Sequence, residues 1–109
     1  MSEKQLLSNI EIDGIVKAIV RTVPVLEIYL FGSSANGTAN EDSDYDFYVV
    51  IPDDGIHARE ASWKIRKAIP KQTRPVDMLV NTKNRFDKFK DTISFVEGEV
   101  VRTGVKLYG

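Results

Sequence analysis

Two aspartates, Asp44 and Asp46, stand at the start of an apolar segment and have the chemistry to bind a metal. The segment 45–51 is rich in aromatic and β-branched residues, which predicts a β-strand. Because alternate residues of a strand point to the same face, we expect the two carboxylates to project side by side. Carboxylates so close repel each other, a bound cation relieves the repulsion, and oxygen ligands favour Mg²⁺. The alternative is structural, since an aspartate before a strand often caps a turn.

A glycine-serine pair, Gly32 and Ser33, precedes Asp44 by ten intervening residues and has the chemistry of a phosphate site. Glycine permits a sharp turn and a close backbone approach, and serine is a favourable N-cap for a helix. The free N–H groups of such a turn and helix start can hold a phosphate. A phosphate site facing two metal-binding carboxylates indicates chemistry on a magnesium-bound nucleotide.

A third acid, Asp77, lies inside the otherwise apolar segment 75–80, which we expect to be a strand. A charge among apolar neighbours is costly unless it is paired or bound to a metal. One interpretation is a salt bridge to Arg74 or another basic residue. The other places Asp77 on a strand beside Asp46, as the third carboxylate of the metal site. The residues alone leave both interpretations open.

The spacing of these residues, Gly32-Ser33, ten residues, then Asp44-x-Asp46, resembles the signature of the DNA polymerase β-like nucleotidyltransferase superfamily. In so short a chain it is similar to the minimal nucleotidyltransferase (MNT) family. The resemblance implies an enzyme that transfers a nucleoside monophosphate, AMP from ATP, to an acceptor hydroxyl and releases pyrophosphate. It implies that Asp44, Asp46 and Asp77 hold two Mg²⁺ ions, with Asp77 as base on the acceptor hydroxyl. It also implies that Gly32 and Ser33 bind the β- and γ-phosphates.

The same resemblance implies a partner protein. MNT proteins are often paired with a HEPN-domain protein in toxin–antitoxin systems, which implies an antitoxin that adds AMP to a tyrosine of its partner (AMPylation). The family commonly has arginines around the glycine-serine turn, where this chain has Ser34 and Asn36. Two alternatives remain: a noncatalytic antitoxin or binding module that neutralises a partner by contact, and a transferase for a small molecule such as an aminoglycoside. A homo- or hetero-oligomer is compatible with each.

The elements that must position these residues follow from hydrophobic periodicity and from turn residues. Apolar residues at helical spacing predict a first helix over 3–22 that ends before Pro24. Further helices are expected to begin at 33–35 and to span 56–69, part of 81–90, and 92–103, with strands over 25–31, 45–51 and 75–80 and a terminal strand or tail over 105–108. This order predicts an α/β (α+β) fold, a small mixed β-sheet packed with helices, as the resemblance also implies.

The length and composition of the chain limit the classes of protein to consider. A length of 109 residues predicts one domain that spans residues 1–109. A net charge of −1 argues against broad binding of extended nucleic acid, which needs a basic surface. The absence of cysteine excludes disulfides, thiolate zinc sites and cysteine nucleophiles. No segment has the length of a membrane span and no signal sequence is recognisable, so we expect a cytoplasmic protein that does not contact a membrane.

The segment 57–74 is strongly basic, with six cationic residues and one acid, Glu60. The cationic residues are Arg59, Lys64, Arg66, Lys67, Lys71 and Arg74. The simplest interpretation is a solvated helix face. The alternative is a basic patch that holds a triphosphate or an acidic partner.

Overall fold

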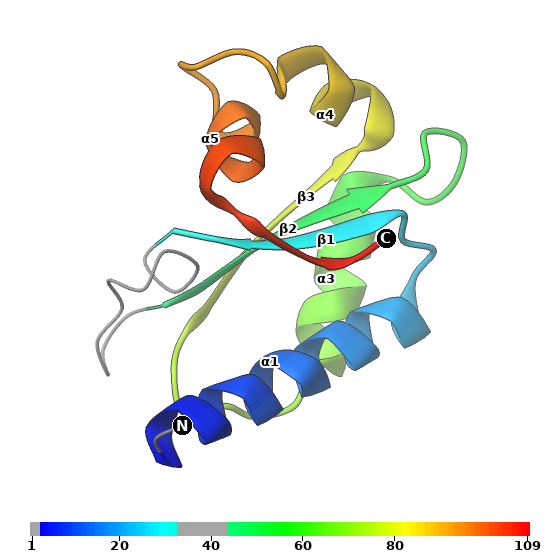
Figure 1. Ribbon diagram of the computed structural model, residues 1–109. Helices are drawn as coiled ribbons and strands as arrows, with labels where there is room; N and C mark the ends of the chain where they lie inside the picture. The colour runs from blue at the N-terminus through cyan, green and yellow to red at the C-terminus, as the bar shows by residue number, and fades with distance from the viewer. Residues whose placement is uncertain (1–2, 33–43) are drawn as a thin grey trace.

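The fold comes from a computed structural model, which describes residues 3–32 and 44–109 (Figure 1). Its described helices are α1 (Glu3–Thr22), α3 (Ala58–Ala68), α4 (Lys83–Phe89) and α5 (Val96–Thr103). Its strands are β1 (Glu27–Phe31), β2 (Tyr45–Ile51), β3 (Val76–Thr82) and β4 (Val105–Tyr108). None of these helices is both long enough and apolar enough to cross a membrane.

The four strands form one mixed sheet in the order β3-β2-β1-β4. Strands β2 and β3 run parallel, whereas β1 is antiparallel to both of its neighbours, β2 and β4. Helices α1 and α3 lie on one side of the sheet and α4 and α5 on the other, as Figure 1 shows. The predicted α/β class, with helices packed on a small mixed sheet, is therefore confirmed.

The central strand β2 is buried on both faces, which explains its nearly continuous apolar sequence. Alternate residues enter two separate cores, because successive side chains of a strand point to opposite faces. Phe47 and Val49 pack with α1 and α3 in the larger core. Tyr48 and Val50 pack with Phe86 of α4 and with α5 in the smaller core.

The elements with the strongest sequence signals have the predicted boundaries. Helix α1 and strand β2 match the predicted ranges 3–22 and 45–51. Helix α3 is slightly shorter than the predicted range 56–69. Strand β4 forms where a strand or tail was expected. The helix predicted to begin at 33–35 lies outside the described residues.

Strand β1 begins at Glu27 rather than at residue 25. Two other boundaries differ because local hydrogen bonds, which the apolar pattern does not reveal, decide them. Helix α5 begins at Val96 rather than at Thr92, since Thr92 forms a turn in which its carbonyl oxygen accepts from Phe95 N at 3.2 Å. That carbonyl approaches Gly98 so closely that a Cβ there would overlap it. Strand β3 continues past the predicted end at residue 80 to Thr82, whose side chain accepts from Arg85 N and caps α4.

Candidate metal and nucleotide site

The predicted site residues Gly32, Asp44, Asp46 and Asp77 gather at one end of the sheet. The antiparallel pairing of β1 and β2 sets the end of β1 beside the start of β2, with Phe31 opposite Asp46. The parallel pairing of β2 and β3 sets the starts of these two strands together, with Asp46 opposite Asp77. In Figure 1 this is the end of the sheet at which β1 ends and β2 begins, with the start of β3 beside β2.

Of the three aspartates, Asp46 is partly buried, while Asp44 and Asp77 are exposed. Burial raises the pKa of Asp46 above its usual value, because desolvation disfavours the charged form. The negative charges of Asp77, Asp44 and Glu99 raise the pKa of this carboxyl further. A cation bound here would relieve both effects, so the donor set fits Mg²⁺.

Gly32 is placed against Asp46 in a conformation that suits glycine. Its φ of +73° lies in the left-handed region, which other residues rarely adopt. A Cβ on Gly32 would overlap Oδ2 of Asp46. The missing side chain therefore brings the backbone of the turn directly to the carboxylate, as a site for a metal-bound phosphate requires. Ser33 lies outside the described residues, and its role stays a prediction.

Asp77 is exposed, so the premise that its charge is surrounded by apolar residues was wrong. Strand β3 is at the edge of the sheet, and the face that carries Asp77 and Leu79 is open to water. The alternative of a salt bridge to Arg74 is also wrong within the described residues, where no ion pair includes Asp77. The guanidinium of Arg74 instead lies over the ring of Tyr45, 5.3 Å from its centroid.

Within the part of the chain that the structure describes, no three His, Cys, Asp or Glu side chains lie close enough to hold one metal ion. The three aspartates, Asp44, Asp46 and Asp77, thus lie at the same end of the sheet, and the charges of Asp44 and Asp77 act on Asp46. A cation held by all three would have to draw their carboxylates together. Their assignment as metal ligands stays a prediction.

The strand end that carries the aspartates is anchored to α1 by a hydrogen-bonded group that the sequence did not indicate. The Tyr45 hydroxyl donates to Oε1 of Glu11 at 2.8 Å. The backbone N–H of Thr73 and its hydroxyl also donate to Glu11. These bonds fix Tyr45, which stands between Asp44 and Asp46. Glu99, whose charge reaches Asp46 from α5, was also missed, because only the tertiary fold brings it there.

Comparison with known proteins identifies a family. A family model described as a nucleotidyltransferase domain matches residues 12–100. Among curated proteins, none matches the chain.

Solved structures share the fold. A crystal structure of a toxin–antitoxin with AMP-PNP is 30% identical, with 89% of this chain and 72% of that chain covered and a TM-score of 0.59. A candidate nucleotidyltransferase from Sulfolobus solfataricus is 20% identical, with 88% and 75% covered and a TM-score of 0.61. A mutant of the toxin–antitoxin MntA-HpeT is 24% identical, with 89% and 72% covered and a TM-score of 0.59. The last two likenesses show the fold alone.

Proposed function

Because this chain belongs to the nucleotidyltransferase domain family, we propose that it is a Mg²⁺-dependent enzyme that transfers AMP from ATP to a hydroxyl of a partner protein. The observation that carries the proposal is the pairing of Asp46 with Asp77 in the parallel register of β2 and β3, with the Gly32 backbone against the Asp46 carboxylate. Metal-binding carboxylates and a phosphate-binding turn are the parts that this reaction needs.

Each site residue has a role in this proposal. Asp44, Asp46 and Asp77 would hold the magnesium, which when bound neutralises phosphate charge and activates the attacking hydroxyl. The backbone at Gly32 and Ser33 would bind the outer phosphates of ATP. Asp77, exposed beside Asp46, would accept the proton of the acceptor hydroxyl. The hydroxyl oxygen then bonds to the α-phosphorus, and pyrophosphate leaves.

A partner protein as acceptor is supported by the 30% identical relative, a toxin–antitoxin crystallised with AMP-PNP. By this likeness we infer that the chain is the antitoxin of a pair and acts in the cytoplasm, with ATP as its nucleotide. A HEPN-domain toxin whose tyrosine accepts the AMP is the partner that the MNT resemblance implies. The chain would act as one domain in a complex with that partner.

A second function, neutralisation of the partner by contact alone, has one observation in its favour. The described carboxylates do not gather into a ready three-ligand metal site. In this alternative the aspartates would have no catalytic role and the partner would stay unmodified.

The intact mass of the partner distinguishes these functions. The protein that co-purifies with this chain, or is encoded beside it, is incubated with Mg-ATP and this chain. We expect its mass to rise by one or more AMP units with the wild type but not with Asp46→Asn. The matched control is Asp54→Asn, an exposed aspartate in the turn after β2, which should behave as wild type. An unchanged mass in an intact complex would support neutralisation by contact.

A further inference from the structure

Strand β3 ends the sheet, so one side of its backbone faces no other strand among residues 3–32 and 44–109. Two hydrogen bonds identify the residues of β3 whose backbone N–H and C=O groups point away from the sheet. The carbonyl of Pro75 accepts from Tyr45 N, at the start of β2, and therefore points into the sheet. The carbonyl of Met78 accepts from Nη2 of Arg66 in α3 at 3.2 Å and therefore points away from β2. Because the hydrogen-bonding groups of a strand alternate in direction, Val76, Met78 and Val80 present their N–H and C=O groups at the open edge.

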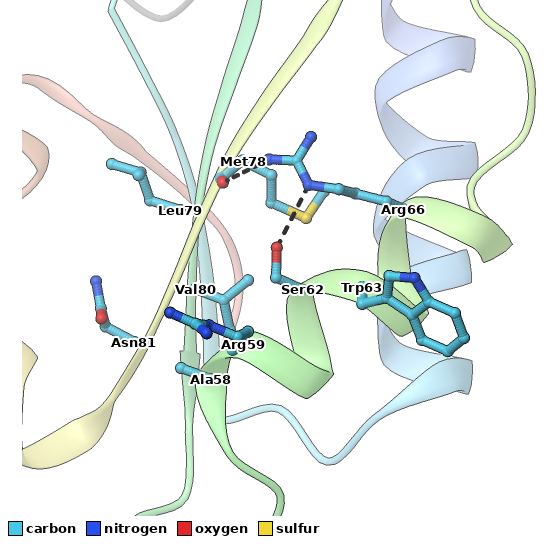
Figure 2. Close-up of a pocket in the computed structure, with 9 residues that line it drawn as sticks. All are labelled: Ala58, Arg59, Ser62, Trp63, Arg66, Met78, Leu79, Val80 and Asn81. Carbon is cyan, nitrogen blue, oxygen red and sulfur yellow. Dashed lines mark hydrogen bonds between the residues drawn. The ribbon is translucent and has the colours of Figure 1, made fainter.

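A groove lies between this edge and helix α3, and Figure 2 shows the side chains that line it. Its volume is about 470 Å³. We call it the β3 groove; the residues used below are Arg59, Trp63, Arg66, Met78 and Val80. Arg59 and Arg66 extend from α3 toward β3, whereas Trp63 points away from the strand and forms the opposite rim. Trp63 is 59% exposed, so apolar surface at this rim is open to a ligand.

The charged side chains that line the groove are both arginines. Neither Arg59 nor Arg66 takes part in an ion pair among the described residues. The nearby acid Glu60 already pairs with Lys64, at 3.6 Å. The ammonium group of Lys67 lies 4.1 Å from the centroid of the Trp63 ring and adds positive charge to the same rim. The field of the groove therefore favours a negatively charged ligand.

We propose that an extended, acidic segment of a protein partner docks in the β3 groove by pairing its backbone with the open edge of β3. Main-chain bonds to Val76, Met78 and Val80 would hold the segment, and its carboxylates would meet Arg59 and Arg66. Added strands gain affinity from backbone bonds and specificity from side chains, and this groove offers both. This docking does not depend on whether the aspartates at the end of the sheet are catalytic.

The position of the groove connects it with the aspartates. Asp77, opposite Asp46, is the residue directly before Met78 on β3. A segment paired along this edge thus brings its neighbouring residues to the end of the sheet at which Asp77 lies. That the docked segment leads to the acceptor hydroxyl rests on the proposed function.

Arg66 has a second role in the free protein, since its bond to Met78 shields one carbonyl of the open edge. Such shielding by a cation limits uncontrolled pairing with other strands. A docking segment would replace this bond with its own N–H, and the guanidinium would then be free to pair with a carboxylate of the segment.

Trp63 is the only tryptophan of the chain, so its fluorescence reports on the groove directly. The probe is a short synthetic peptide of alternating Glu and Val residues, and the control peptide has Lys in place of Glu. We expect the Glu peptide to change Trp63 emission at saturable concentrations, with affinity that falls as salt rises, and the Lys peptide to have no effect. Hydrogen exchange of the Val76, Met78 and Val80 amides should slow when the Glu peptide binds.

A pair of matched variants tests the charges. Arg59→Gln/Arg66→Gln should weaken binding of the Glu peptide by about tenfold, from two exposed ion pairs. Arg21→Gln/Arg102→Gln removes the same charge from exposed positions on α1 and α5 and should bind as wild type. Arg59→Gln alone leaves the Met78 contact in place and should give an intermediate loss, which separates charge from any effect on folding.

Several results would overturn the proposal: no binding of the Glu peptide, equal binding by the double variant, or binding without slower exchange at the β3 edge. A dimer in sedimentation whose β3 amides are already protected would assign the edge to a second copy. Weaker Mg-ATP binding by Arg59→Gln/Arg66→Gln would assign the arginines to the nucleotide. Asp46→Asn should still bind the Glu peptide, so failure of the proposed catalytic function and failure of docking are separate outcomes.

Discussion

At the scale of single residues, Asp46 carries a charge that the fold disfavours in the absence of a ligand. Burial and the neighbouring acids raise its pKa above the ordinary value of 3.8. The folded protein therefore holds this proton to higher pH than the unfolded chain. The contribution of the Asp46 carboxyl to the stability of the fold is fully present below its ordinary pKa. This contribution is lost as pH rises through the raised pKa. Such a cost is typical of a residue placed for binding rather than for folding.

Replacement of this carboxylate should therefore stabilise the protein. Asp46→Asn is expected to raise the free energy of unfolding at neutral pH by about 0.5 kcal/mol, a small value because the group is only partly shielded from solvent. The gain over wild type should grow as pH increases above about 4 and then level off. Urea denaturation of wild type and Asp46→Asn at a series of pH values, without divalent metal, measures this gain in stability. A variant less stable than wild type at neutral pH would contradict this explanation.

Gly32 offers a second test at the same scale. Gly32→Ala puts a Cβ into the left-handed region and against the Asp46 carboxylate, and should cost about 1–2 kcal/mol of stability. The matched control is Gly55→Ala, since a Cβ at Gly55 would meet nothing within 4 Å. Its effect on denaturation should stay within about 0.5 kcal/mol. Equal effects of the two substitutions would show that the approach of Gly32 to Asp46 is unimportant.

How far the site could be predicted depends on the residue. Asp44 and Asp46 follow from spacing along one strand, which sequence displays directly. The opposition of Asp77 to Asp46 was predicted as one alternative, but for a wrong reason, since Asp77 is exposed. Glu11 and Glu99 could not be found, because their positions beside Tyr45 and Asp46 depend on how α1 and α5 pack.

At the scale of elements, a buried acid joins α5 to the sheet and to α4. Glu97 is fully buried, and its Oε2 accepts from the Tyr48 hydroxyl at 2.6 Å and from Nε of Arg85 at 3.2 Å. Burial and then the bond to Glu97 raise the pKa of the Tyr48 phenol. Tyr48 therefore serves the core rather than the edge of the site. This bond holds the helix that carries Glu99 against the strand that carries Asp46.

Removal of one hydroxyl tests this link. Tyr48→Phe keeps the ring but removes one of the two donors to the buried carboxylate, and should cost about 2 kcal/mol in the free energy of unfolding. Tyr108→Phe is the control, because Tyr108 is exposed on β4 and should change stability by less than about 0.5 kcal/mol. Thermal or urea denaturation of both variants measures these changes in stability. If Tyr48→Phe left the free energy of unfolding unchanged, the bond to Glu97 would contribute little to stability.

At the scale of the whole molecule, the two sides of the sheet have separate cores, and the site lies at the end where three strands meet. The fold class, the family and the nucleotidyltransferase assignment predicted from the sequence are confirmed. The strand order β3-β2-β1-β4 was not predicted, because Asp77 was interpreted as a charge among apolar neighbours and not as a sign of an edge strand. That order is what leaves β3 open beside the basic helix α3.

Binding of a non-hydrolysable ATP analogue, titrated by calorimetry with and without Mg²⁺, tests the central claim most directly. We expect binding by the wild type only when Mg²⁺ is present, loss of that binding in Asp46→Asn, and wild-type binding in the exposed control Asp54→Asn. This pattern would mean that the aspartates at the strand end hold the metal-bound nucleotide. Binding that does not depend on Mg²⁺, or that persists unchanged in Asp46→Asn, would contradict it.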